Sequence, residues 1–298
     1  MKEIEDTNIG KILKKIRTKK GVSTTAFMTA MALSASQLSK IERGEQSVNA
    51  DFFIKALSYL NVTFEEFGFL FKDSYFKARV ETKRDLKNLI IDLQYNHYLK
   101  AMMVRVDKHY QDFKEPYFLH IYSMLDSRLI LSETGVDFEK ARTALKPVKD
   151  YLLSVETWFE YEIGLFSNCY YLFPIEETIK IANETLSKMK NSSLARLEEL
   201  TRDLFINLAL YALEEKDYCT DAIDFASQAL NCQVKDPFYT SLMVRVLKQI
   251  AYYKLESPLY SESQLSNLIK GLNLLDFGDL SNDFMILLKK HEIPISNC

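Results

Sequence analysis

Residues 34–47 read SASQLSKIERGEQS and combine small polar groups with charge in one short stretch. Its hydroxyls, its two amides and its two cations include the side chains of Ser34, Ser36, Gln37, Lys40 and Arg43. An amide donates and accepts hydrogen bonds at once, and lysine and arginine side chains bind phosphate. A helix that only covers a core needs no such groups on its outer face. The stretch therefore indicates a helix that enters a groove of DNA.

The charge of the chain is divided unevenly, although the formal total is only −3. Residues 8–60 hold nine lysines and arginines against three acidic residues, which gives a net charge of +6. Residues 68–298 hold 28 basic against 33 acidic residues, which gives −5. A small basic region beside a larger acidic one indicates that the basic region meets a polyanion. Salt-sensitive binding to nucleic acid is the expected activity of that region.

The composition favours an all-α protein of about two domains. The chain has 298 residues, 47% of them hydrophobic, with only 8 glycines and 6 prolines. Such scarcity suits long helices with short connections. No N-terminal basic segment precedes an apolar run, and no stretch is long enough to cross a bilayer, so a cytosolic location and no membrane partner are expected. The four cysteines, Cys169, Cys219, Cys232 and Cys298, have no metal-site spacing and are interpreted as ordinary thiols.

Five short helices are expected before residue 71, because each has a start signal. A residue that can cap a helix N-terminus precedes each one, and a Gln or Glu three residues later completes two capping boxes. The caps are Asn8, Ser23, Ser34, Asn49 and Thr63, with ends expected at Lys19, near Met31 and near Leu60 for the first, second and fourth helices. Apolar residues at helical spacing would close a compact core: Ile9, Ile12, Leu13, Ile16, Phe27, Met31, Leu38, Ile41, Phe53, Ile54 and Leu57.

Residues 21–67 resemble the Cro and lambda-repressor type of helix-turn-helix, without a gap. In that alignment Gly21 precedes the second helix, Ser34 opens the recognition helix and the residues IERG close it. The resemblance implies that Ser34, Ser36 and Gln37 face base edges in the major groove, with Gln37 able to bond adenine N6 and N7 together. It assigns Thr24, Lys40 and Arg43 mainly to phosphates.

Several of these assignments have alternatives. Thr24 and Ala35 depart from the residues that are usual in that family. This leaves open that the predicted DNA-binding domain, residues 1–71 and called the head below, is no longer used for DNA. Arg43 could pair with Glu42 around the turn at Gly44. The basic residues of the first helix could attract DNA or form a solvated face; they are Lys14, Lys15, Arg17, Lys19 and Lys20.

The chain after about residue 75 contains a divergent repeat. Four amphipathic segments start about 40 residues apart, near Glu115, Val155, Leu194 and Asp236, and a shorter partner helix follows each one. Helix pairs at that period are typical of an α-solenoid of the tetratricopeptide kind, which binds peptides or helices on its concave face. The predicted organisation is a DNA-binding domain in residues 1–71, a linker at about 68–76 and a tetratricopeptide-like domain in residues 77–298 with a C-terminal capping helix.

A Cro-type helix-turn-helix domain followed by such a repeat domain resembles the Rgg group of the RRNPP regulators, the cytosolic peptide-pheromone receptors of low-GC Gram-positive bacteria. The line TWFEYEIGLFSN carries the most specific match in the repeat domain, through Trp158, Tyr161, Glu162, Leu165, Phe166 and Asn168. The resemblance implies a homodimeric transcription factor for quorum sensing, whose partners are double-stranded promoter DNA and a short signalling peptide. We expect the dimer contact in the last repeats and the cap, where Phe284, Ile286 and Leu287 supply apolar surface.

An extended peptide presents unpaired backbone groups and a terminal carboxylate, so amide and guanidinium side chains on the first helices of the repeats are candidate ligands. Asn168 and Asn207 fit best, one repeat apart, and Tyr171, Tyr211, Arg128 and Arg245 are further candidates. The alternative is that these asparagines only satisfy local backbone groups.

No catalytic site is predicted. His97, His109, His120 and His291 are scattered, and none of the usual nucleophile, zinc or P-loop motifs lies near them. We therefore expect no enzyme activity, no cofactor and no metal. Besides the peptide-responsive regulator, a non-enzymatic solenoid scaffold and a regulator that binds proteins through the solenoid alone remain possible functions.

Overall fold

The computed structural model describes residues 8–71, 73–91, 96–134, 137–188, 195–232, 234 and 237–295, and in this part of the chain every regular element is helical. The chain divides into two compact units, Met1–Phe118 and Leu119–Cys298. The prediction of an all-α protein is confirmed for the described residues.

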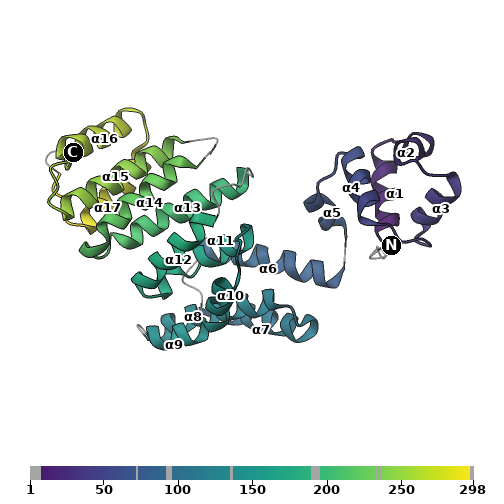
Figure 1. Cartoon of the computed structure of the whole chain (residues 1–298), viewed down its shortest axis with the longest axis horizontal. Coiled ribbons are helices and arrows are strands. Elements are labelled where there is room, and N and C mark those ends of the chain that lie inside the picture. The colour runs from purple at the N-terminus through teal and green to yellow at the C-terminus, as the bar shows by residue number, and fades with distance from the viewer. Residues whose placement is uncertain are drawn as a thin grey trace. The chain divides into compact units, whose positions relative to one another are not determined.

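The helices of the first unit are α1 (Ile9–Lys19), α2 (Thr24–Met31), α3 (Ala35–Arg43), α4 (Ala50–Tyr59), α5 (Phe64–Leu70), α6 (Ser74–Ile91) and α7 (Asn96–Phe113) (Figure 1). Helix α8 (Pro116–Thr134) crosses the boundary. The second unit continues with α9 (Phe138–Ala144), α10 (Lys146–Ser154), α11 (Glu160–Ser167), the 3-10 helix η1 (Tyr170–Leu172), α12 (Ile175–Lys188), α13 (Ala195–Ala212), η2 (Lys216–Tyr218), α14 (Cys219–Asn231), α15 (Phe238–Lys254), α16 (Glu262–Leu274) and α17 (Gly278–Lys290).

The first five helices start where their capping residues predict. The side chains of Asn8, Ser23, Ser34, Asn49 and Thr63 each accept a hydrogen bond from a backbone N–H in the first turn of the following helix. Capping boxes are formed at Ser34 with Gln37 and at Thr63 with Glu66. Because a cap bonds only to residues two or three positions away, these starts depend on local sequence alone.

The core of the five helices contains most of the predicted apolar residues. Ile12, Leu13, Ile16, Phe27, Met31, Leu38 and Leu57 are buried in one cluster. Ile54 is an exception, because it is 53% exposed. Helix α4 turns Ala56, Leu57 and Leu60 into the core, and Ile54 falls outside that stripe.

Helices α1 and α3 approach each other closely at Gly10. A Cβ atom added to Gly10 would lie 1.9 Å from the backbone oxygen of Ile41, so only glycine permits this distance. Helix α3 ends at Gly44, whose φ of 79° forms the left-handed C-cap. These two glycines determine how the C-terminal end of α3 meets α1.

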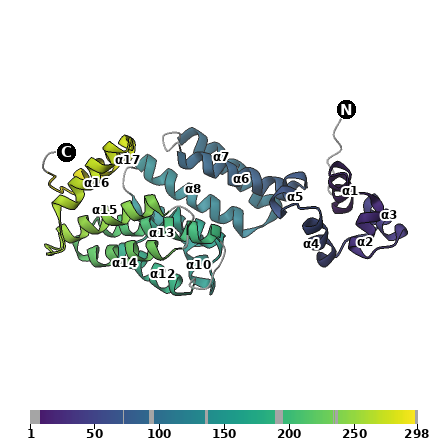
Figure 2. The same ribbon diagram turned by 90° about the horizontal axis from the view of Figure 1, so that it is seen from above.

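The second unit is a succession of packed helices. Helix α13 packs on α14, α14 on α15, and α16 on α17 (Figure 2). Small residues permit close contact, and five alanines of α13 and α14 are at most 1% exposed: Ala209, Ala212, Ala222, Ala226 and Ala229. The helix pairs agree with the predicted tetratricopeptide-like arrangement, and α17 follows the last pair as the predicted cap.

Two predicted helices have different bounds. The first helix of the second repeat was expected from Val155, but α11 covers only Glu160–Ser167, because Glu162 accepts from the backbone N–H of Phe159 and so caps the helix there. The partner of the first repeat is divided into α9 and α10, with Pro147 in the first turn of α10. Proline has no N–H and its ring clashes with the preceding turn, so it favours a new helix start.

Two further features concern the whole described part. None of its helices is both long enough and apolar enough to cross a membrane. Cys169, Cys219 and Cys232 are free thiols, and Cys298 lies outside the described residues.

Candidate nucleic-acid interface

The N-terminal end of α3 is fixed by two residues that were predicted to contact bases. The Ser34 hydroxyl accepts from the Gln37 backbone N–H at 3.2 Å, and Gln37 Oε1 accepts from the Ser34 backbone N–H at 2.9 Å and from its hydroxyl at 3.0 Å. Both side chains are exposed. A glutamine that binds adenine N6 and N7 needs its oxygen as well as its nitrogen. Base contact of this form therefore competes with the capping box.

The start of α2 presents Thr24 to solvent. Thr24 is the first residue of the helix, and the preceding Ser23 hydroxyl accepts from the backbone N–H of Ala26 at 3.1 Å. Backbone N–H groups in a first turn carry partial positive charge and favour anions. The position suits a phosphate contact.

The outer face of α3 carries the remaining predicted residues. Ser36, Lys40 and Arg43 are exposed and follow one another at spacings of four and three residues, which places them on one side of the helix. The turn before α3 sets its angle to α2: Ala32 has a φ of 53°, and the Leu33 N–H donates to the Met28 oxygen at 3.0 Å.

Arg43 is paired with Glu45 and not with Glu42. Its Nε and Nη2 donate to the two carboxylate oxygens of Glu45 at 2.6 and 2.7 Å, and its Nη1 donates to the Ser39 hydroxyl at 2.7 Å. The hydrogen bond raises the pKa of Arg43 and lowers the pKa of Glu45. Since both side chains are more than half exposed, the pair can open toward solvent.

Glu42 instead pairs with Arg17 in the interior. Arg17 Nε and Nη2 donate to the carboxylate at 2.7 and 3.1 Å, and Nη1 donates to the Val22 oxygen at 2.8 Å. Arg17 is 7% exposed. Arg17 therefore fits neither of the two roles that the sequence left open for the basic residues of this helix, attraction of DNA or a solvated face. Its spacing from Ile12, Leu13 and Ile16 on the inner face of α1 is the signal that could have revealed this.

Some of the residues proposed to contact a peptide meet in the second unit. Arg128, on α8, donates from Nη2 to the backbone oxygen and to Oδ1 of Asn168, both at 3.2 Å. Its Nε is buried without a hydrogen-bond partner. Asn168 also donates from Nδ2 to the Gly164 oxygen at 2.7 Å, which is the local backbone bond that the alternative interpretation expects.

The tyrosines of this region share one neighbour. The rings of Tyr171 and Tyr211 lie 5.7 and 5.5 Å from the ring of Tyr170. The Tyr211 hydroxyl donates to the Phe173 oxygen at 3.0 Å, and burial raises the pKa of Tyr211. Asn207 lies one turn before Tyr211 on α13 and is half-buried.

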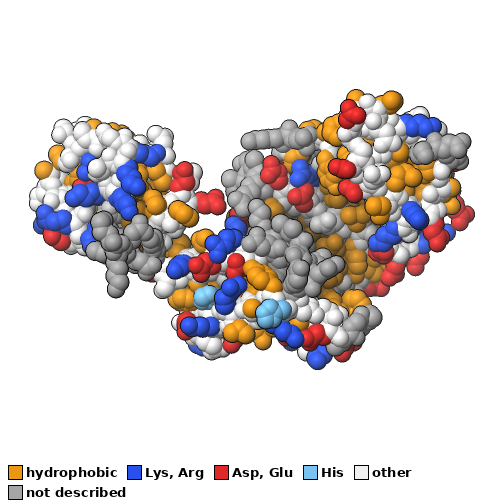
Figure 3. All heavy atoms as spheres, turned by 180° about the vertical axis from the view of Figure 1, so that it is seen from behind, with side chains coloured by type: hydrophobic (Ala, Val, Ile, Leu, Met, Phe, Trp, Pro, Cys, Tyr) orange, Lys and Arg blue, Asp and Glu red, His pale blue; other side chains and the backbone are white. Residues whose placement is uncertain are grey.

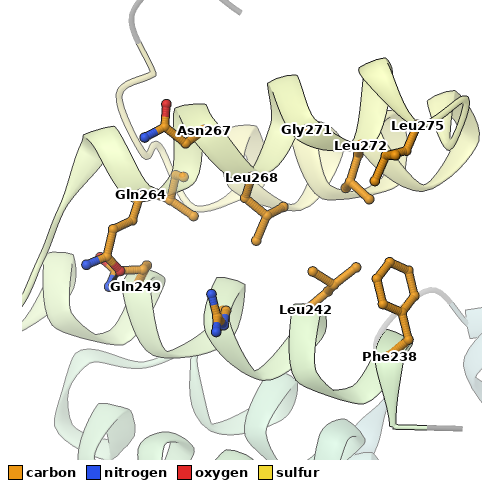
Figure 4. A pocket seen from close by; sticks show the side chains of 11 residues that line it. Phe238, Leu242, Gln249, Gln264, Asn267, Leu268, Gly271, Leu272 and Leu275 are labelled. Carbon is orange, nitrogen blue, oxygen red and sulfur yellow. Dashed lines mark hydrogen bonds between the residues drawn. The ribbon is translucent and has the colours of Figure 1, made fainter.

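Arg245 is not part of this group. It lines a groove between α15 and α16 with Gln249, Gln264 and Asn267 (Figure 4). The other side chains of the groove are apolar and include Phe238, Leu242, Leu268, Leu272 and Leu275. The sequence grouped Arg245 with Arg128 by repeat position, but none of the other residues proposed to contact a peptide lines this groove.

The residues expected at a dimer contact differ in exposure. Phe284 is 1% exposed and belongs to the core, so its side chain offers no surface to a second chain. Ile286, on α17, is 68% exposed, and Leu287 is half-buried. The helical phase of α17 turns Ser281, Phe284 and Leu288 inward, which explains the difference.

A buried polar cluster in the second unit was not predicted. The His120 Nδ1 lies 2.7 Å from the Tyr161 hydroxyl, and Tyr151 hydrogen-bonds to Glu162. Burial lowers the pKa of His120, and burial together with the Glu162 hydrogen bond raises the pKa of Tyr151 to about 12. His120 and Tyr161 are 41 positions apart in the sequence, so no local pattern signals their contact.

A capped, exposed helix that follows a tight turn and carries polar and basic side chains defines a helix-turn-helix DNA-binding protein, joined here to a domain of helix pairs. Residues 13–67 match the family model described as helix-turn-helix. Residues 100–285 match the model of the C-terminal domain of the HTH-type transcriptional regulator Rgg. The chain belongs to this family of transcriptional regulators.

Solved structures share the fold. The SHP pheromone receptor Rgg2 of Streptococcus dysgalactiae is 22% identical, with a TM-score of 0.68 over 94% of this chain and 98% of that one. A putative transcriptional regulator from Listeria monocytogenes EGD-e is 19% identical, with a TM-score of 0.69 over 97% and 98%. The chain of a PrgX/cCF10 complex is 16% identical, with a TM-score of 0.66 over 98% and 95%.

Proposed function

We propose that this chain is a cytoplasmic, homodimeric regulator that binds a promoter operator through residues 1–71 and a short signalling peptide through residues 77–298. The peptide controls the activity of the regulator, through its affinity for DNA or through its geometry, and the chain has no enzyme activity. The solved structures of a pheromone receptor and of a PrgX/cCF10 complex support this function through their shared fold.

The main support for the peptide site is that the positive charge of Arg128 is half-buried without a negative partner among the described residues. The side chain is half-buried, its Nε lacks a hydrogen-bond partner, and it forms no ion pair within the described residues. A guanidinium in such a place costs desolvation energy without the return of an ion pair. A peptide carboxylate would supply the missing acceptor and charge.

The neighbouring residues suit the rest of a peptide. Asn168 holds Arg128 in place from the end of α11, so it acts on the peptide through Arg128. Asn207, Tyr171 and Tyr211 add amide and aromatic groups for an extended backbone. Arg245 lines its own groove and is a separate candidate for a second part of the peptide.

The test is a titration with a synthetic peptide, taken from any short reading frame found beside the gene, in its free-acid and C-terminally amidated forms. The variant Arg128→Met should bind the free acid more weakly by about 1.5 to 3 kcal/mol, or roughly 10- to 150-fold. Amidation should weaken binding to the unaltered chain similarly and change little for the variant, provided that the terminal carboxylate is the group bound.

Melting temperatures decide between a binding and a structural role. Removal of an unpaired, half-buried charge should leave the melting temperature unchanged or raise it. The double variant Asn168→Ala and Asn207→Ala should lose peptide affinity whether or not the loss of the bonds to Arg128 and Gly164 lowers its melting temperature. A stable Arg128→Met variant with unaltered peptide affinity, or a destabilised asparagine variant with unaltered affinity, would contradict the assignment.

A further inference from the structure

Helix α1 carries a row of lysines on the side opposite to its buried face. Lys11, Lys14, Lys15 and Lys19 are exposed, at the spacing that keeps side chains on one helix face. Together with Thr18 they line a shallow groove that also includes Glu42, Arg43 and Glu45. The groove therefore joins α1 to the C-terminal end of α3.

The charge in this groove is not neutralised by its acidic members. Glu42 is paired with Arg17, and Glu45 is paired with Arg43. Within the described residues, none of the four lysines forms an ion pair or a side-chain hydrogen bond. Among the residues that the structure describes, the four positive charges of the groove thus have no partner. Figure 3 shows several lysine and arginine side chains on one face of the N-terminal helices, at the left of the view.

The arrangement is unfavourable for the helix itself. Lys11 and Lys15, and likewise Lys15 and Lys19, are like charges one turn apart, which destabilise a helix. The first turn contains no acidic residue and carries Lys11, although the N-terminal end of a helix favours negative charge. Sequence features that destabilise a helix, without a stabilising contact in return, are expected at functional sites. The lysines of α1 are such a feature.

We propose that this lysine groove binds phosphates of the DNA backbone, as a contact additional to that of the recognition helix. The proposal rests on the proposed function, since it presumes that the head binds DNA. Arg43 is exposed at the end of α3 and also lines the groove, so the phosphates held there adjoin the backbone next to the recognition helix. Lysines act on phosphate as point charges and read no sequence.

The groove should therefore contribute the same amount to the binding affinity for every DNA sequence. The probe is a fluorescent 40-base-pair duplex of random sequence, titrated with the full chain at increasing KCl. The variant K14Q/K15Q should lower the steepness of log affinity against log salt by about 1.8, since each phosphate contact contributes about 0.9. The deficit in affinity relative to the unaltered chain should shrink about twelvefold between 50 and 200 mM salt, as that slope requires.

The matched control is K20Q/K55Q, which removes the same charge from the same domain. Lys20 donates to the Asn61 oxygen at 3.0 Å and Lys55 is exposed on α4, and neither lines the groove. This control should keep the salt dependence of the unaltered chain. The charge-retaining variant K14R/K15R should keep it as well.

Stability gives an independent readout. K14Q/K15Q should melt at the same temperature as the unaltered chain or higher, because it removes repulsion. If that variant folds poorly, Lys19→Gln alone must still lower the slope by about 0.9. An unaltered chain that fails to bind the duplex refutes the proposed function, whereas binding with equal slopes for K14Q/K15Q and K20Q/K55Q refutes the lysine groove alone.

Discussion

At the scale of single residues, the ion pair between Arg17 and Glu42 shows how one buried charge depends on another. Both side chains are 9% exposed, and Arg17 also bonds to the Val22 oxygen. Arg17→Met should destabilise the head by about 3 to 5 kcal/mol, because Glu42 is then buried without a partner. Urea unfolding followed by circular dichroism measures this change.

The double variant Arg17→Met with Glu42→Leu is the control for that prediction. It replaces both charges by apolar groups and should recover most of the lost free energy of unfolding. Equal destabilisation in the single and double variants would show that packing, and not the unpaired carboxylate, dominates.

Glu45 restrains Arg43 at the DNA-facing end of α3. Glu45→Gln should strengthen binding to the random duplex, because it removes a negative charge and leaves the Arg43 guanidinium available to phosphate. The slope of log affinity against log salt should become steeper by up to about 0.9. Glu65→Gln, which removes an exposed acid from α5, is the charge-matched control and should change the slope little. Unaltered binding in Glu45→Gln would place Arg43 away from the DNA.

At the scale of elements, the start of α3 serves both folding and recognition. Gln37→Ala should remove about 1 to 3 kcal/mol of discrimination at one base position of each half-site and leave non-specific binding nearly intact. Lys40→Ala should instead weaken binding to all sequences. Selection from a randomised site compares the two variants. Identical base preferences in Gln37→Ala and the unaltered chain would contradict the placement of α3.

Two buried histidines make the packing of the second unit sensitive to acid. Burial lowers the pKa of His120 and of His291, so both are neutral in the folded state at pH values where the unfolded chain already binds protons. The free energy of unfolding should therefore decrease as pH falls below about 6.5, the unperturbed pKa of histidine. The negative charge of Glu162 partly opposes the lowering of the His120 pKa, and that of Glu214 partly opposes the lowering of the His291 pKa.

The measurement is the melting temperature between pH 7 and pH 5. Replacement of both histidines by glutamine should flatten its decline, even if the variant melts lower at pH 7. His97→Gln, at an exposed position of α7, serves as the substitution control. An unchanged pH profile in the double variant would show that other groups govern the acid sensitivity.

At the scale of the whole molecule, a dimer is expected because one small head contacts too little DNA for strong specificity, whereas two heads engage two half-sites. Light scattering of the full chain should give twice the chain mass of 34.7 kDa. Ile286→Asp should weaken the dimer, because Ile286 is exposed on α17, while Leu153→Asp on α10 serves as an exposed apolar control. A mass of one chain at micromolar concentration would oppose this prediction.

The helix starts of the head, the helical class and the family could all be predicted from the amino-acid sequence. Asn8, Ser23, Ser34, Asn49 and Thr63 could be recognised as caps because each acts on a backbone N–H within three residues. The repeat spacing likewise revealed most helix pairs of the second unit, since amphipathic periodicity is a property of contiguous residues.

The tertiary structure decided which side chains are inside and which groups meet. Arg17 is buried because its partner Glu42, 25 residues away, lies across the contact of α1 and α3, and Phe284 is buried because of the phase of α17. Helix packing also brings Arg128 to Asn168, 40 residues away, whereas Arg245 lines the groove between α15 and α16. Contacts between distant residues depend on how helices pack, and no local pattern of residue types specifies that packing.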